Sequence, residues 1–356
     1  MIEKIHIQNF KSIQDVELDL QPINVLIGSN GAGKSNFVNF FNLIHAIYQG
    51  ELSDYTAQRG GANRMMHLGQ GEPFKIKGDI NFSNTNRYAF VLKRNDNDGL
   101  FFANEGDYFN RNVYGFSGWI FDSYGKGHGE SKLVKLNDGR RKYVKEYLDS
   151  FRVYHFHDTS KNAPLKATAR VADTRFLKSD GSNLAAFLYD LQQNYVRSFN
   201  LIESAIKLIA PYFERFDFLP NGDYIRLNWR QKGTDMYLDA ADLSDGTIRF
   251  IGLVTLLLQP NLPPTILIDE PELGLHPSAI NILAGLVQSV SAKSQIILST
   301  QSVNLVNEFA PEDIIVVENK NNESLFRRLN EDELKDWLDE YTLGDLWNKN
   351  VFGGNP

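Results

Sequence analysis

The stretch GSNGAGKS, from Gly28 to Ser35, fits the pattern G-x-x-x-x-G-K-[ST] at every fixed position. The apolar run Ile23–Ile27 precedes it, and apolar residues at helical spacing follow from Phe37 to Ile47. The glycines let backbone amides turn toward phosphate oxygens, and the onset of a helix adds the positive end of its dipole. The stretch therefore predicts a phosphate-binding loop between a strand and a helix.

The side chains of this loop predict its ligand. Lys34 is placed to bridge the β- and γ-phosphates of a nucleotide, and the Ser35 hydroxyl is placed to ligate Mg²⁺. We therefore expect ATP and Mg²⁺ to bind here. The predicted nucleotide contacts within the loop and just after it are Asn30, Gly31, Gly33, Lys34, Ser35 and Asn36.

A second motif, ILIDEPELGLHP, runs from Ile266 to Pro277 and has a hydrophobic strand that ends in two acids. Asp269 is predicted to hold the Mg²⁺ shell, and Glu270 to accept a proton from the attacking water. Adjacent acids at an apolar strand end are costly unless a metal or hydrogen bonds compensate them. More than two hundred residues separate Lys34 from Asp269. The two halves of the nucleotide site must therefore meet in one sheet.

Two shorter motifs accompany the acids. In LSDGT, Leu243–Thr247, Ser244 is a good N-cap and Gly246 leaves the amides open, so this helix start suits an anion. In STQS, Ser299–Ser302, Thr300 and Gln301 are predicted to project from the carboxyl edge of the sheet, where α/β folds bind ligands. The Gln301 amide can hydrogen-bond to phosphate or water but cannot titrate.

Composition limits the other functions. The 356 residues include no cysteine, which excludes disulfides, zinc–thiolate sites and thiol nucleophiles. The N-terminus lacks the apolar region of a signal peptide, and the longest apolar run, Phe250–Leu258, is too short to span a membrane. We expect a cytoplasmic protein with no membrane partner. The net charge of −7 is uneven, because Lys126–Lys178 holds thirteen Lys and Arg against six Asp and Glu.

Hydrophobic patterns along the chain predict an α/β fold. A β-rich N-terminal lobe surrounds the loop helix, Glu105–Asp138 is read as an irregular insertion, and Phe151–His157 as a strand. A short helical insertion and a hairpin come next, and the last third alternates strand and helix, which implies a parallel sheet. The ranges expected for the insertion are Asn183–Asn194 and Val196–Phe213 for its helices, and Tyr224–Arg230 with Asp235–Asp239 for its hairpin. The predicted domains are residues 1–180, 181–235 and 236–356.

Together these motifs resemble the ABC-type ATPase heads of the SMC/RecF/OLD superfamily, as does the opening IEKIHIQNFKSIQDVELDL. The resemblance implies a head-to-head homodimer or higher oligomer, in which Ser244 and Gly246 of one copy close over the γ-phosphate held by Gly28–Ser35 of another. Gln301 stands where the family usually has a switch histidine. No lid glutamine is recognisable between Phe151 and Lys161, and long coiled coils are absent.

The endings YTLGDLW and FGGNP look like those of small stand-alone ATPases of this group, which work with a separate partner protein. The favoured function is a slow ATP hydrolase, with Lys34, Glu270 and Gln301 as catalytic residues, whose association controls a separate effector. A nuclease of antiviral defence is one candidate effector. Two alternatives stay open: a RecF-type repair ATPase that binds DNA or RNA, and a nucleotide-dependent scaffold without catalysis. The densest basic residues are Lys132, Lys135, Arg140, Arg141, Lys142 and Lys145.

The segment YHFHD offers one more interpretation. Its residues His155, His157 and Asp158 could ligate a metal, although surface histidines on an alternating strand are commoner.

Overall fold

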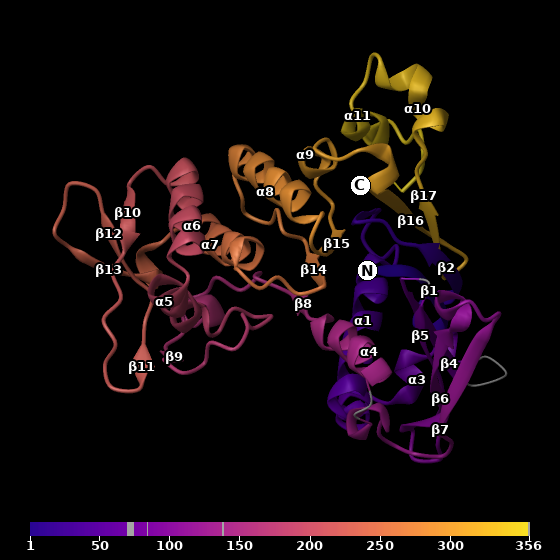
Figure 1. Cartoon of the computed structure of the whole chain (residues 1–356). Helices are drawn as coiled ribbons and strands as arrows, with labels where there is room; N and C mark the ends of the chain where they lie inside the picture. The colour runs from indigo at the N-terminus through magenta and orange to yellow at the C-terminus, as the bar shows by residue number, and fades with distance from the viewer. Residues whose placement is uncertain (70–74, 84, 137–138, 355–356) are drawn as a thin grey trace.

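The computed structural model describes residues 1–69, 75–83, 85–136 and 139–354 (Figure 1). The strands are β1 Ile2–Phe10, β2 Ile13–Asp19, β3 Ile23–Ile27, β4 Lys75–Phe82, β5 Asn86–Arg94, β6 Leu100–Asn110, β7 Trp119–Gly125, β8 Val153–Tyr154, β9 Ala169–Arg170, β10 Phe213–Phe216, β11 Tyr224–Ile225, β12 Asn228–Gln231, β13 Tyr237–Asp239, β14 Thr265–Asp269, β15 Gln295–Ser299, β16 Ile314–Lys320 and β17 Glu323–Arg328. The helices are α1 Lys34–Gln49, α2 Leu52–Gln58, α3 Ala62–Met65, α4 Gly139–Ser150, α5 Leu184–Asn194, α6 Val196–Ile209, α7 Asp245–Leu258, α8 Pro277–Val290, α9 Val303–Val306, α10 Glu331–Leu338 and α11 Leu343–Asn348.

A central sheet unites the two ends of the chain. Its strand order is β17-β16-β3-β15-β14-β8, and all neighbours are parallel except β17, which pairs antiparallel with β16. Strand β3 leads into the phosphate loop and β14 ends in the two acids, with β15 between them. The carboxyl ends of all three strands therefore lie at one edge, as the distant motifs required.

The central sheet is buried on both faces, and alternate residues serve two cores. Leu26, Leu267 and Ile297 pack in the core of the N-terminal lobe, which includes the apolar side of α1. Val25, Ile268 and Ile296 point the other way, into the core formed with α5 to α8. Figure 1 shows α1 and α4 on one side of this sheet and α5 to α8 on the other. Full burial of each such side chain contributes about 1.5–3 kcal/mol.

The N-terminal lobe is a six-stranded antiparallel sheet, ordered β2-β1-β4-β5-β6-β7, against which α1 and α4 pack. Helix α1 ends at Gln49, and Gly50 follows with φ of 74°. That left-handed conformation suits glycine, which closes the last turn through its N–H.

The interpretation of Glu105–Asp138 as an irregular insertion is wrong. The second half of β6 and all of β7 lie in this range, although residues 137 and 138 are outside the described part. The alternation was hidden because Glu105 and Asp107 are buried acids on β6. Glu105 accepts hydrogen bonds from Tyr88 and Ser131, which compensate its burial. Helix α4, within the basic region, was not predicted either.

Three other boundaries differ from the sequence predictions. The strand expected over Phe151–His157 is reduced to the two residues of β8. Helix α6 ends at Ile209 instead of Phe213, because Pro211 disfavours helical backbone at the residue before it. In the expected hairpin, β12 pairs with β13, whereas β11 pairs with β9. In the part of the chain that the structure describes, no helix is long and apolar enough to cross a membrane.

Candidate functional site

The phosphate loop owes its shape to glycines that no other residue could replace. Gly28 has φ of 149°, and a Cβ there would overlap the carbonyl oxygen of Val317 on β16. Gly33 has φ of 118° and caps α1, and a Cβ there would overlap the hydroxyl of Ser324. Gly31, by contrast, has φ of 79° with nothing within 4 Å of its Cβ position. The loop is thus pressed against β16 and β17, with its exposed tip at residues 29–31.

A small hydroxyl network supports the loop from behind. The Ser324 hydroxyl donates to the carbonyl of Ala32 at 2.6 Å and lies 2.6 Å from the Ser12 hydroxyl. The Asn36 amide donates to Ser12 Oγ at 2.7 Å. The side chain of Asn36 thus binds this network, while the hydroxyl-bearing residue Ser35 is exposed.

The Lys34 side chain is buried and bends back over the loop. Its ammonium donates to the carbonyls of Gly28 and Ser29, the latter at 3.1 Å. Burial lowers the pKa of Lys34, and the carboxylates of Glu270 and Asp269 act in the opposite direction. Those acids reach Lys34 from β14, so the structure brings together the two motifs that lie far apart in the sequence.

Asp269 and Glu270 end β14 at the same edge. Asp269 pairs in register with Ser299 of β15, and its Oδ1 is buried with no hydrogen-bond partner among the described residues. Glu270 has φ of 45°, an unusual value for a side chain of its size. Its N–H donates to the carbonyl of Ser299 at 2.7 Å, and its Oε1 accepts from the Gln301 amide at 2.6 Å. Gln301 therefore holds the carboxylate that is predicted to act as the base.

Two histidines that follow β8 also reach this edge. His157 Nε2 lies 2.9 Å from the carbonyl oxygen of Asp269, and His155 Nδ1 lies 3.7 Å from its Oδ2. Burial lowers the pKa of His155, which the Asp269 carboxylate opposes only in part. The sequence analysis considered these histidines only as candidate metal ligands with Asp158, and did not predict that they lie beside Asp269. The described residues include no group of three or more His, Cys, Asp or Glu that could hold a metal. Asp158 instead accepts from the N–H of Ser160.

Glu272 is a further acid that the sequence did not single out. Its Oε1 accepts from the Thr300 hydroxyl at 2.6 Å and from the Gln301 N–H at 3.2 Å. Its Oε2 is buried without a hydrogen-bond partner in the described part of the chain. Burial raises the pKa of this carboxyl group above its ordinary value.

The Ser244 turn lies on the other side of the central sheet from α1. Ser244 is exposed and caps α7 by accepting from the N–H of Thr247 at 3.2 Å. The core contacts of α7 belong to the lobe of α5 to α8, whereas those of α1 belong to the N-terminal lobe. Gly246 packs on Gly274, where a Cβ would lie 2.5 Å from the carbonyl oxygen.

The basic region is less available than its sequence indicated. Arg141 is buried, forms ion pairs with Asp107 and Asp122, and stacks over the ring of Tyr124. Lys132, Lys135 and Lys142 are exposed. The described structure includes the backbone of Arg140 but not its side chain.

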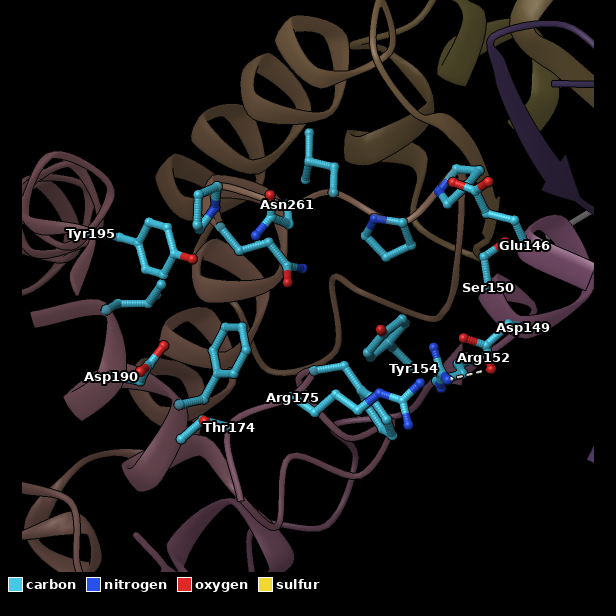
Figure 2. A pocket seen from close by; sticks show the side chains of 18 residues that line it. Glu146, Asp149, Ser150, Arg152, Tyr154, Thr174, Arg175, Asp190, Tyr195 and Asn261 are labelled. Carbon is cyan, nitrogen blue, oxygen red and sulfur yellow. Dashed lines mark hydrogen bonds and ion pairs between the residues drawn. The ribbon is translucent and has the colours of Figure 1, made fainter. Parts of the chain in front are cut away.

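A cavity of about 290 Å³ lies away from these residues (Figure 2). Its lining includes Arg152, just before β8, and Pro264, just before β14, so it opens at the amino edge of the sheet. Tyr195 and Asp190 of the helical lobe face Arg175 across it. None of the predicted site residues lines this cavity.

The residues at the carboxyl edge fit a magnesium nucleotide. The glycine loop offers its amides and the buried Lys34 offers a cation. The Oδ1 of Asp269, which has no hydrogen-bond partner within the described part of the chain, is a carboxylate oxygen that a metal could satisfy.

Comparison with known proteins agrees with this architecture. The family model described as "AAA domain, putative AbiEii toxin, Type IV TA system" matches residues 23–307, which include the phosphate loop, both acids and Gln301. Curated proteins give no match to the sequence.

Two solved structures share the fold at low sequence identity. One is an Smc head bound to the C-winged helix domain of ScpA, with a TM-score of 0.60, 15% identity, and coverage of 94% of this chain and 99% of that one. The other is an Smc head domain with an extended coiled coil, bound to the C-terminal domain of ScpA from Pyrococcus furiosus. It has a TM-score of 0.57 and 15% identity, and covers 95% and 98% of the two chains. The α/β head fold predicted from the motifs is thereby confirmed.

Proposed function

The chain belongs to the family described as "AAA domain, putative AbiEii toxin, Type IV TA system", and from this premise we propose that it is an ATP-driven switch. In this proposal it binds ATP, associates head to head with a second copy, hydrolyses the nucleotide slowly and thereby controls a separate effector protein. The observation that carries the proposal is the meeting of Lys34, Asp269, Glu270 and Gln301 at one sheet edge.

Each residue at the edge has a chemical part in the proposed hydrolysis. The amides of residues 28–35 and the Lys34 ammonium would bind the β- and γ-phosphates. Mg²⁺, held by Ser35 and Asp269, would neutralise charge on the phosphate oxygens. Glu270 would take a proton from the attacking water, and Gln301 would orient that carboxylate. Turnover should be slow, because Gln301 stands where the family usually has a switch histidine and its amide cannot titrate.

A second copy is part of the proposal because one chain keeps its two phosphate-binding features apart. The phosphate loop and the Ser244 turn belong to elements that pack on opposite faces of the central sheet. A site that uses both would therefore be completed by Ser244 and Gly246 of another copy. The N-terminal turn of α7, where Ser244 is exposed, would present the positive end of a fourteen-residue helix to the nucleotide bound by the other copy.

The effector is the least constrained part of the proposal. Heads of this fold have been seen bound to a domain of a separate protein, ScpA. A nuclease of antiviral defence remains our candidate effector on the strength of the motif resemblance. Direct nucleic-acid binding of the RecF type is less favoured, because the Arg141 side chain is buried and already forms ion pairs with Asp107 and Asp122. A scaffold without catalysis is less favoured because Glu270 is placed beside Lys34.

Substitution of the two central residues tests the proposal. Glu270→Gln removes the base and leaves the fold, so we expect ATP hydrolysis to fall by about 10²–10⁴-fold. This variant should accumulate as an ATP-bound dimer. Lys34→Ala should bind no ATP and stay monomeric. Phosphate release and light scattering after size-exclusion chromatography measure both, with Glu340→Gln, an exposed acid, as the control. Unchanged turnover in Glu270→Gln would remove Glu270 from the mechanism.

A mixture of two inactive variants tests the shared site. Ser244→Arg blocks the turn, and Lys34→Ala empties the loop, so a mixed dimer keeps at most one complete site. The mixture should recover turnover that neither variant has alone, up to about half of the wild-type rate per mixed dimer. No recovery, or dimers that ignore ATP, would refute the head-to-head arrangement.

A further inference from the structure

Arg249, on the second turn of α7, joins three separate parts of the ATP site. Its Nε donates to the carbonyl of Phe156 at 3.0 Å and its Nη2 to the carbonyl of His157 at 2.6 Å. Its Nη1 donates to the carbonyl of Leu273 at 2.9 Å. One planar guanidinium thus holds two loops that are more than a hundred residues apart.

Both loops contact residues that bear the predicted catalytic groups or lie next to them. The first continues from the Phe156 carbonyl to His157, whose imidazole bonds the carbonyl of Asp269. The second contains Glu272, which holds Thr300 and the backbone of Gln301. Arg249 is therefore one hydrogen bond away from each loop and two or three away from the metal-binding and water-activating carboxylates.

Close packing ties the Ser244 turn to the same loops. A Cβ at Gly246 would lie 2.5 Å from the carbonyl oxygen of Gly274, so the two backbones touch. Gly274 has φ of 70°, and a Cβ there would overlap the Arg249 guanidinium. Because the turn contacts the loop at Gly274 and the loop contacts the guanidinium there, displacement of the turn would press on the other two.

We infer that Arg249 is a positioning residue that couples the Ser244 turn to the acids of its own ATP site. The inference rests on the proposed function, in which the Ser244 turn touches ATP held by a second copy. Closure on that ATP would push α7, and Arg249 would carry the movement to the loops of residues 156–158 and 270–275. Each copy would then adjust its own carboxylates in response to the nucleotide of the other.

Lysine at position 249 separates this role from simple charge. Lys keeps the positive charge but is a point donor on a flexible stem, and it cannot span three carbonyls with fixed geometry. Arg226→Lys is the matched control, because Arg226 donates from Nε to the Thr168 hydroxyl and is exposed.

Hydrogen exchange of the nucleotide-free chain tests the clamp without any need for a dimer. Three backbone N–H groups report on the two loops. Those of Leu273 and Leu275 donate to the carbonyls of Glu270 and Glu272, and that of His155 donates to the carbonyl of Ser179. We expect Arg249→Lys to speed exchange in both loops about tenfold, while Arg226→Lys and the amides of α8 stay unchanged. Acceleration in neither loop, or in only one, would overturn the inference.

Mixed dimers then test on which site Arg249 acts. When Arg249→Lys is added to the Ser244→Arg chain, it shares a chain with the working phosphate loop. The Ser244 turn of that chain touches no ATP in this dimer, so the mixture tests whether Arg249 positions its own acids, and we expect turnover to fall about tenfold while ATP affinity changes less than about twofold. The coupling is tested in the Arg249→Lys homodimer, in which both turns touch ATP and turnover should fall by more than tenfold. When it is added to the Lys34→Ala chain, the rate should stay the same. The reverse pattern would mean that Arg249 merely supports the Ser244 turn, and would overturn the inference. Failure of all mixtures to associate with ATP would refute the proposed function, and the exchange result would still decide the role of Arg249.

Discussion

The predicted ATP site has two parts that are built differently: the phosphate loop of residues 28–35, and the acid edge, formed by Asp269, Glu270 and Glu272. The phosphate loop is backed by hydrogen bonds that involve Ser324, Ser12 and Asn36, and its glycines are packed against β16 and β17. The acid edge keeps three buried oxygens that lack hydrogen-bond partners among the described residues. They are Asp269 Oδ1, Glu272 Oε2 and Ser299 Oγ.

The polar groups that support the loop have hydrogen-bond partners, whereas the acid edge keeps buried oxygens that have none among the described residues. A buried oxygen without a partner costs about 1–3 kcal/mol, and a residue held at positive φ, such as Glu270, costs a similar amount. Such costs persist where ligands or movement relieve them. The loop is therefore suited to bind nucleotide in its present shape, and the acid edge is suited to change when nucleotide and a second copy arrive.

The largest effect should come from a change in the phosphate loop at Gly28. Gly28→Ala places a Cβ against the Val317 carbonyl in a conformation that already disfavours alanine. We expect the free energy of unfolding to drop by about 3 kcal/mol, measured by urea denaturation. ATP binding should be lost as well.

Gly31→Ala is the matched control, because Gly31 also has positive φ but has open space around its Cβ position. Its cost should stay near 1 kcal/mol, from backbone conformation alone. Equal costs for the two variants would mean that packing against β16 does not shape the loop.

A smaller effect should follow from loss of the hydroxyl behind the loop. Ser324→Ala removes the hydrogen bond to the Ala32 carbonyl and the contact with Ser12. We expect ATP affinity to weaken about five- to tenfold, equivalent to about 1–1.4 kcal/mol. Titration with a fluorescent ATP analogue measures this. Ser289→Ala loses a similar bond to a helix carbonyl on α8 and should leave the affinity unchanged. A loss of stability without a loss of affinity would contradict a supporting role for Ser324.

The phosphate loop and the strand that carries the two acids could both be predicted from the sequence. Phosphate loops are local, so the residue types of Gly28–Ser35 and the apolar runs on both sides were enough to place β3, the loop and α1. Strand β14 and its acids were equally local. Helix α4 and strand β7 were missed because their patterns depend on burial of Glu105, Asp107 and Arg141, whose partners come from other elements.

The surroundings of the acid edge could not be predicted, because they depend on contacts between residues far apart in the sequence. His157, Glu272 and Arg249 reach the site through hydrogen bonds to residues at least 24 positions away. The sequence indicated a strand ending at His157, but it gave no sign that His157 or Glu272 lies beside the predicted acids. The role of Asn36 also needed the structure, because Ser12 lies in the turn between β1 and β2.

The smallest effect that we predict concerns Glu272 and depends on pH. Burial raises the pKa of Glu272 above its ordinary value of 4.5, while the hydrogen bonds from Thr300 and Gln301 oppose the shift in part. The folded chain therefore holds this proton more tightly than the unfolded chain. Its contribution to stability is complete below pH 4.5 and is lost as the pH rises through the raised pKa.

Glu272→Gln removes this titration but keeps an oxygen that can accept from Thr300 and Gln301. Relative to wild type, the variant should gain stability as the pH rises above 4.5, until the raised pKa is passed, and the gain should be smaller than either effect above. Urea midpoints between pH 4.5 and 8 measure this difference, with Glu340→Gln as an exposed control. If Glu272→Gln is instead less stable at every pH, the hydrogen bonds to the carboxylate outweigh the cost of its burial. The acid edge would then be stabilised by its own hydrogen bonds, as the phosphate loop is.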